Sequence, residues 1–103
     1  MSKIISKTLK FNPPEVMTDV ASFNVFFSQD ALTYDSPCVS VPVDPGADEY
    51  AVTIPGPGIV ITEGTYNIGV SSVDAAGNQS DIEQISFPFD LTAPPPPENL
   101  RVL

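Results

Sequence analysis

The chain has few side chains that could carry out catalysis, because none of its 103 residues is a histidine. Without an imidazole it has neither Ser-His-Asp nor Cys-His chemistry, and it lacks the commonest ligand of transition metals. The glycine-rich phosphate-binding motifs GxGxxG and the P-loop are absent from the sequence. The thirteen acidic residues are scattered through loops, and no spacing selects a pair for glycoside hydrolysis. We therefore expect a protein that is not an enzyme and needs no cofactor.

The acidic loops are the remaining candidates for an ion site, because hard oxygen ligands suit Ca²⁺. Asp44 and Asp48 lie in one such loop, and Asp74 and Asn78 lie in another. Neither loop has the residue spacing of an EF-hand. Asp74 and Asn78 are also residue types that cap turns through hydrogen bonds between side chain and backbone. The turn-capping interpretation is favoured, so we expect no metal, with these four residues as the calcium candidates.

The net charge of −9 and the single cysteine narrow the class of partner and the source of stability. An acidic surface repels phosphate backbones and anionic lipid, so we expect neither nucleic acid nor a membrane as partner. Cys38 has no second cysteine with which to form an internal disulfide. Residues 1–11 lack the apolar segment of a signal peptide. The chain as it stands is therefore expected in the cytoplasm, or outside the cell if it is a fragment of a larger exported protein.

The elements that must position these residues are short strands. Twelve prolines and six glycines interrupt any helical period, whereas strands joined by turns tolerate them. Alternating apolar runs cover residues 5–11, 21–27, 39–43, 50–54, 66–71 and 85–89. Ile59 to Ile61 is interpreted either as a very short strand or as the approach to the next one. Together these segments predict about seven strands in an all-β, antiparallel two-sheet sandwich.

Three positions in these runs carry further expectations. Pro42 and Pro88 cannot donate a hydrogen bond to a ladder, so Pro42 predicts an edge strand and Pro88 predicts an edge position or a strand end. Phe26 is out of phase with Phe23, Val25 and Phe27, and it is expected to face solvent or a partner. Together with Tyr34 and Tyr50, Phe26 is a candidate for an aromatic binding surface.

The pattern of residues resembles a fibronectin type III domain or the related bacterial immunoglobulin-like sandwich. The resemblance covers residues 5–90 and is carried by Lys10 to Pro14, by Phe23 within ASFNVFF, and by Gly64 to Ser80. It implies that Phe11 takes the place of a core tryptophan and that Phe23 is the core aromatic of the next strand. It also implies that the hydroxyl of Tyr66 contacts backbone upstream of it.

The resemblance also leaves a gap, because the chain begins almost at the family's second strand. Residues 92–103 follow the predicted sandwich of residues 1–91, and the segment ENLRVL at their end resembles the missing first strand. Pro94, Pro95, Pro96 and Pro97 favour a stiff polyproline spacer, after which Leu100 and Val102 alternate as in a strand. The resemblance places the two chain ends at opposite poles, so the tail is not expected to fill the gap in its own sandwich.

Two functional hypotheses follow from these observations. The first is a structural or spacer module, in which the tail either links to a following domain or completes the sheet of another copy, head to tail. The second is an adhesion-type module that binds protein or glycan within a larger surface protein or enzyme. The first hypothesis names other protein domains and further copies of the chain as partners, and the second adds a glycan.

Overall fold

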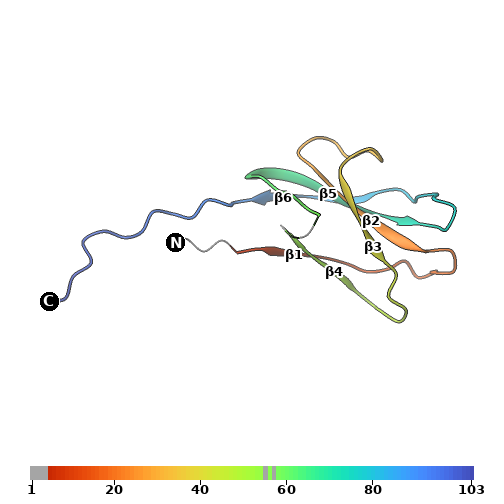
Figure 1. Ribbon diagram of the computed structural model, residues 1–103, viewed down its shortest axis with the longest axis horizontal. Helices are drawn as coiled ribbons and strands as arrows, with labels where there is room; N and C mark the ends of the chain where they lie inside the picture. The colour runs from red at the N-terminus through yellow and green to blue at the C-terminus, as the bar shows by residue number, and fades with distance from the viewer. Residues whose placement is uncertain (1–4, 55, 57) are drawn as a thin grey trace.

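The computed structural model describes residues 5–54, 56 and 58–103, and the described residues form an all-β sandwich of two antiparallel sheets (Figure 1). The smaller sheet pairs β1 with β4, and the larger sheet has the order β3-β2-β5-β6. Expectations that concern residues 1–4, Pro55 and Pro57 lie outside the described residues. The strands are β1 (Lys7–Phe11), β2 (Ser22–Ser28), β3 (Cys38–Pro42), β4 (Tyr50–Ile54), β5 (Gly64–Val73) and β6 (Glu83–Phe89).

The described residues form six strands, one fewer than the seven expected. Ile59 to Ile61 is not a strand, because its backbone is held in a tight turn in which the Ile59 N–H donates to the Gly56 carbonyl oxygen at 3.0 Å. Gly58 has a φ of 78°, which favours glycine. Ile59 and Ile61 are nevertheless buried, so this segment contributes side chains to the core without joining a sheet.

Proline marks the two edges of the larger sheet. Pro42 ends β3 and Pro88 lies in β6, and these are the outermost strands of the order β3-β2-β5-β6. Both edge assignments made from the sequence are therefore confirmed. Each proline leaves its edge without a backbone N–H at that position, which weakens the edge as a template for a further strand.

The core lies between the two sheets, where the alternating runs turn their apolar sides inward. One end of the interior is occupied by three aromatic rings, because Phe11 stacks on Tyr50 at 5.3 Å and Phe23 meets both rings at 5.2 and 4.9 Å. Aromatic pairs in this distance range stabilise a core beyond the area that they bury. The rest of the core is aliphatic and aromatic, with Val25, Phe27, Ile54, Ile59, Ile61, Tyr66, Ile68 and Phe89 as its buried members.

Phe26 is fully buried, so the expectation that it faces solvent or a partner is wrong. It does point to the side of the sheet opposite the core. The loop that follows β2 folds back over that side, and the ring of Tyr34 packs edge-on against Phe26 at 6.4 Å. The Tyr34 hydroxyl fastens the loop by donating to the Ser80 carbonyl oxygen at 2.9 Å. A short-range alternation could not reveal this cover.

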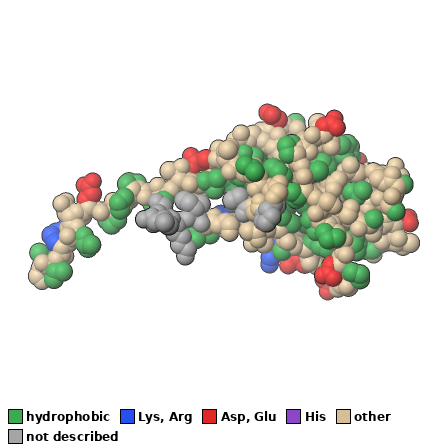
Figure 2. Space-filling model, viewed as in Figure 1, with side chains coloured by type: hydrophobic (Ala, Val, Ile, Leu, Met, Phe, Trp, Pro, Cys, Tyr) green, Lys and Arg blue, Asp and Glu red, His purple; other side chains and the backbone are tan. Residues whose placement is uncertain are grey.

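Residues 92–103 form a tail that stands clear of the sandwich (Figures 1 and 2). The tail leaves from the tail pole, which we define as the end of the sandwich where β1 begins at Lys7 and β6 ends at Phe89 (Figure 1). The far pole is the end where β1 finishes at Phe11 and β6 begins at Glu83. The tail therefore leaves beside the start of β1, and the placement of the two ends at opposite poles is wrong. The physical reason is that β1 and β6 run in opposite directions, so the start of β1 and the end of β6 lie at the same pole.

Candidate functional site

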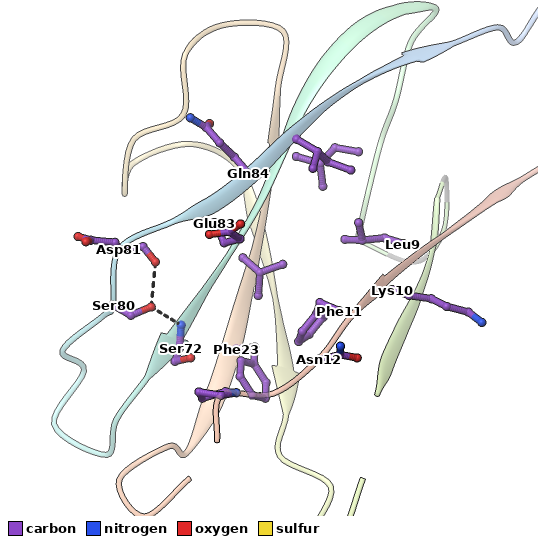
Figure 3. Close-up of a pocket in the computed structure, with 14 residues that line it drawn as sticks. Leu9, Lys10, Phe11, Asn12, Phe23, Ser72, Ser80, Asp81, Glu83 and Gln84 are labelled. Atoms are coloured by element: carbon purple, nitrogen blue, oxygen red, sulfur yellow. Dashed lines mark hydrogen bonds between the residues drawn. The ribbon is translucent and has the colours of Figure 1, made fainter. Parts of the chain in front are cut away.

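A groove runs along the side of the sandwich between β1 and β6 (Figure 3). Its main part has a volume of about 430 Å³. Apolar side chains from both sheets reach into it, with Leu9 and Phe11 coming from β1 and Ile68 and Val70 from β5. A smaller hollow of about 60 Å³ continues along β1 towards the tail pole and is also lined by Leu9, Ile68 and Ile85. The sandwich is thus open along the whole length of β1.

Ile85 shows how incompletely this side is covered. Its side chain faces the groove from β6 but remains 55% exposed. Phe87 and Phe89 lie on the same face of the strand, and Phe87 is less exposed and Phe89 is buried. In a closed sandwich a residue in this phase of the strand would be buried. The groove is therefore an unfinished part of the core.

The two rims of the groove differ in charge. On β1, Lys10 points away from the groove, and its ammonium nitrogen lies 3.5 Å from a carboxylate oxygen of Glu49 (Figure 3). On the opposite rim, Asp81, Glu83 and Gln84 line the groove. An occupant of the groove would have to be apolar on its inner side and would meet carboxylates on the β6 side.

The backbone of β1 is paired on one side only. Its five residues pair with β4 in a continuous antiparallel register from Lys7 with Ile54 to Phe11 with Tyr50. No other described strand pairs with β1. The other side of β1 therefore presents the N–H and C=O groups of an open sheet edge, and it does so at the mouth of an apolar groove. Such an edge is a template for a further strand.

The tail carries side chains that match this edge. Leu100 and Val102 are 98% and 100% exposed, and they make no packing contact within the described chain. Pro94 to Pro97 precede them without secondary structure. Asn99 has a φ of 57°, and the Arg101 side chain donates to the Asn99 carbonyl oxygen at 2.8 Å, so the tail does not form a strand by itself.

The calcium candidates are engaged in turns. The Asp74 carboxylate accepts hydrogen bonds from the backbone N–H groups of Ala76 and Asn78 at 3.0 and 2.8 Å, and from the Asn78 side-chain amide at 3.1 Å. These bonds, with that of the Asn78 side chain the largest, lower the pKa of Asp74. In the other loop the Asp44 N–H donates to the Tyr50 hydroxyl at 2.9 Å. Within the described ranges, no three acidic or cysteine residues, Asp48 included, gather in a way that could hold a metal ion.

The three residues singled out for the core, Phe11, Phe23 and Tyr66, all pack inside the sandwich. Phe11 and Phe23 belong to the aromatic cluster described above. The Tyr66 hydroxyl accepts a hydrogen bond from the backbone N–H of Thr62 at 2.9 Å and also lies 2.9 Å from the Thr62 hydroxyl. This contact ties the start of β5 to the segment that precedes it. These side chains support the fold, and Phe11 and Phe23 also line the groove.

The expected aromatic binding surface is not present. Phe26 and Tyr50 are 0% and 7% exposed, and of the three candidates only Tyr34 has an exposed ring. A flat glycan-binding face needs several exposed rings side by side, and these three residues do not provide it.

Comparison of the chain with protein-family models, with curated proteins and with solved structures gives no match. In the part of the chain that the structure describes, no helix has the length and apolar character needed to cross a membrane.

Sequence reasoning missed the groove itself. Ile68, Val70 and Ile85 lie in the apolar phase of the runs at 66–71 and 85–89, and that phase does not distinguish a groove from a closed core. The signal that pointed to an opening was indirect, namely that the resemblance left its first strand without a counterpart ahead of residues 5–11. Only the positions of β1 and β6 show that the gap leaves a groove.

Proposed function

We propose that this chain is a non-catalytic structural module of the fibronectin type III-like kind, which links to further copies head to tail. The tail of one copy adds as a strand to the open edge of β1 in the next. The observation that carries this proposal is the apolar groove beside that edge, together with the exposed Leu100 and Val102. Strand addition is a common mode of recognition, in which backbone hydrogen bonds supply affinity and alternate side chains supply specificity.

The energetics favour a weak, concentration-dependent link. Full burial of two aliphatic side chains such as Leu100 and Val102 is worth about 3–6 kcal/mol. Association costs at least about 4 kcal/mol in lost translational and rotational freedom. The two side chains therefore roughly offset that cost, and the net affinity comes from the ladder on β1 and from the partial burial of Ile85. We expect dissociation constants in the micromolar to millimolar range.

The charge of the chain gives this link a characteristic salt dependence. Each copy has a formal net charge of −9, so two copies repel one another at low ionic strength. Salt screens this repulsion, because the Debye length falls to about 10 Å at 0.1 M. Assembly through an apolar groove should therefore strengthen with added salt, whereas assembly through ion pairs would weaken.

Sedimentation velocity over a concentration series tests the proposal. The full chain should sediment faster as concentration and salt increase, and deletion of residues 93–103 should leave a monomer at every concentration. The last strand ends at Phe89 and Leu91 packs against the core, so the deletion should leave the sandwich folded, as circular dichroism would verify. If the folded, shortened chain sediments like the full chain, the proposal is wrong.

A further inference from the structure

The groove and the tail together specify how two copies would be joined. Building on the proposed function, we infer that residues 98–103 of one copy enter the groove of the next at the far pole. Leu100 to Leu103 then pair antiparallel with β1, with Leu100 beside Phe11. The occupant is thus a second copy of this chain, and the tail matches the groove in length, direction, side-chain phase and charge.

The length of the paired segment follows from the prolines. Pro94 to Pro97 have no N–H groups and cannot join a ladder, so pairing can start no earlier than Glu98. Six extended residues cover about 20 Å at about 3.3 Å per residue, and the five residues of β1 cover about 17 Å. Residues 98–103 are thus long enough to reach along the open edge, and the four prolines bridge about 12 Å between sandwiches.

The direction of the tail decides between its own groove and that of a neighbour. A tail that turned back at the tail pole would place Pro94 to Pro97 beside the start of β1 (Figure 1). The residues without N–H groups would then occupy the first half of the groove. A tail that arrives from another copy at the far pole leaves its prolines outside and brings residues that have N–H groups along β1. The second arrangement therefore makes more backbone hydrogen bonds.

The choice of β1 over β6 follows from the same direction. A strand that enters at the far pole runs antiparallel to β1 and parallel to β6, because β1 and β6 run in opposite directions (Figure 1). Antiparallel pairing is slightly more stable per residue. Pro88 also removes one donor from the free edge of β6. The incoming strand therefore extends the smaller sheet from two strands to three.

The phase of the side chains limits the register. Leu9 and Phe11 of β1 face the groove, so Leu100 and Val102 must lie opposite residues of this phase. A slip by one residue would turn both apolar side chains outward. Two registers remain, in which Leu100 lies beside either Phe11 or Leu9. Asn99, whose φ is now 57°, must become extended in either case.

Charge selects the register with Leu100 beside Phe11. This register places Glu98 beyond the end of β1, next to Pro13, whereas the other would bring the Glu98 carboxylate against the ring of Phe11. An unpaired carboxylate is costly in such an apolar environment. Arg101 then lies on the outer face beside Lys10, whose charge is already offset by Glu49 at 3.5 Å.

Two tail variants test the phase, with all other features of the chain unchanged. Leu100→Asp places a carboxylate in the groove and should abolish assembly in sedimentation velocity. Leu103→Asp is the matched control, because residue 103 lies on the outer face of the added strand and is equally exposed in the free chain. It should retain assembly to within about threefold in dissociation constant. Equal loss in both variants would overturn the inference.

Disulfide trapping tests the register. Residues directly opposite one another in an antiparallel pair lie about 4.5–5.5 Å apart at Cα, within the range of about 4.4–6.8 Å that a disulfide requires. In a Cys38→Ser background, Lys10→Cys with Arg101→Cys should oxidise to a ladder of covalent oligomers. Thr8→Cys with Arg101→Cys, which matches the other register, should give far less cross-linking.

The outcomes separate this inference from the proposed function. Cross-linking by the Thr8 pair alone overturns the register and leaves head-to-tail linkage standing. The same conclusion holds if neither pair cross-links although the chain still assembles through its tail. An internal disulfide without a ladder shows that the tail fills its own groove, which overturns donation between copies. Absence of assembly at any concentration overturns both.

Discussion

The hydroxyl of Tyr66 is one oxygen atom whose contribution to stability can be isolated. Tyr66→Phe removes the acceptor for the Thr62 N–H and the partner of the Thr62 hydroxyl, both at 2.9 Å. The ring stays, so the edge-on contact with Phe89 at 5.8 Å is preserved. The substitution therefore tests the hydrogen bonds and not the packing.

The expected loss follows from the surroundings of the two partners. Tyr66 is 7% exposed, but Thr62 lies at the surface, so water can reach part of what is left unpaired. A net contribution of about 0.5–1 kcal/mol for each of two hydrogen bonds gives a loss of about 1–2 kcal/mol. For a domain of this size such a loss lowers Tm by roughly 4–15 °C.

Urea unfolding followed by circular dichroism provides the measurement, since a change of midpoint at constant slope reports stability alone. Tyr34→Phe is the control, because it removes a hydroxyl that also makes a hydrogen bond at 2.9 Å, but from a half-exposed ring. It should cost less than about 0.5 kcal/mol. Thr62→Val combined with Tyr66→Phe should cost less than the sum of the two single changes, because the residues share a contact. If Tyr66→Phe lowers the free energy of unfolding no more than Tyr34→Phe does, the contact between Tyr66 and Thr62 does not anchor β5.

Three further substitutions probe the core, the packing of Leu32 and Ile82 against Gly69, and the turn at Asp74. Phe23→Leu loses two aromatic contacts, each worth about 0.5–1.5 kcal/mol, so the free energy of unfolding should fall by about 1–3 kcal/mol in urea titration. Gly69→Ala should cost about 1–3 kcal/mol, because a Cβ there would collide with Ile82 and lie 2.7 Å from Leu32; adding Leu32→Ala should cost less in this background than in the wild type. The pKa of Asp74 is lowered in the folded state, so its ionised form adds stability that is lost as pH falls below its ordinary value of 3.8. Asp74→Ala should therefore unfold at lower urea than the wild type at pH 7, and the two midpoints should converge in acid; a constant difference would contradict this assignment.

The strands themselves could be predicted from the sequence because their evidence is local. Alternation within a few residues located β1, β2, β4 and most of β5 and β6, since period-two burial is a property of each strand. Proline chemistry identified both edges of the larger sheet, because a missing N–H has the same consequence in any sheet. The turn at Asp74 was likewise readable, since its bonds reach only as far as Asn78.

The burial of Phe26 and the turn at Ile59 could not be predicted in this way. Phe26 is covered by a loop whose position depends on a hydrogen bond from Tyr34 to Ser80, which lie 46 residues apart. Ile59 and Ile61 are spaced as apolar residues in a strand are. The turn at Gly56 and Gly58 nevertheless directs both side chains into the core, and the segment forms no ladder with a sheet. In both cases a contact between distant segments decided the outcome.

For the candidate site, the sequence by itself determined that the chain has an apolar, strand-like tail behind four prolines. It could not determine where the sandwich has an opening, nor at which pole the tail departs. Those depend on how β1 and β6 face one another across the two sheets, which is a long-range arrangement that no local spacing encodes. The groove exists because β1 has a partner on one side only, and the number of partners of a strand is decided by the tertiary structure.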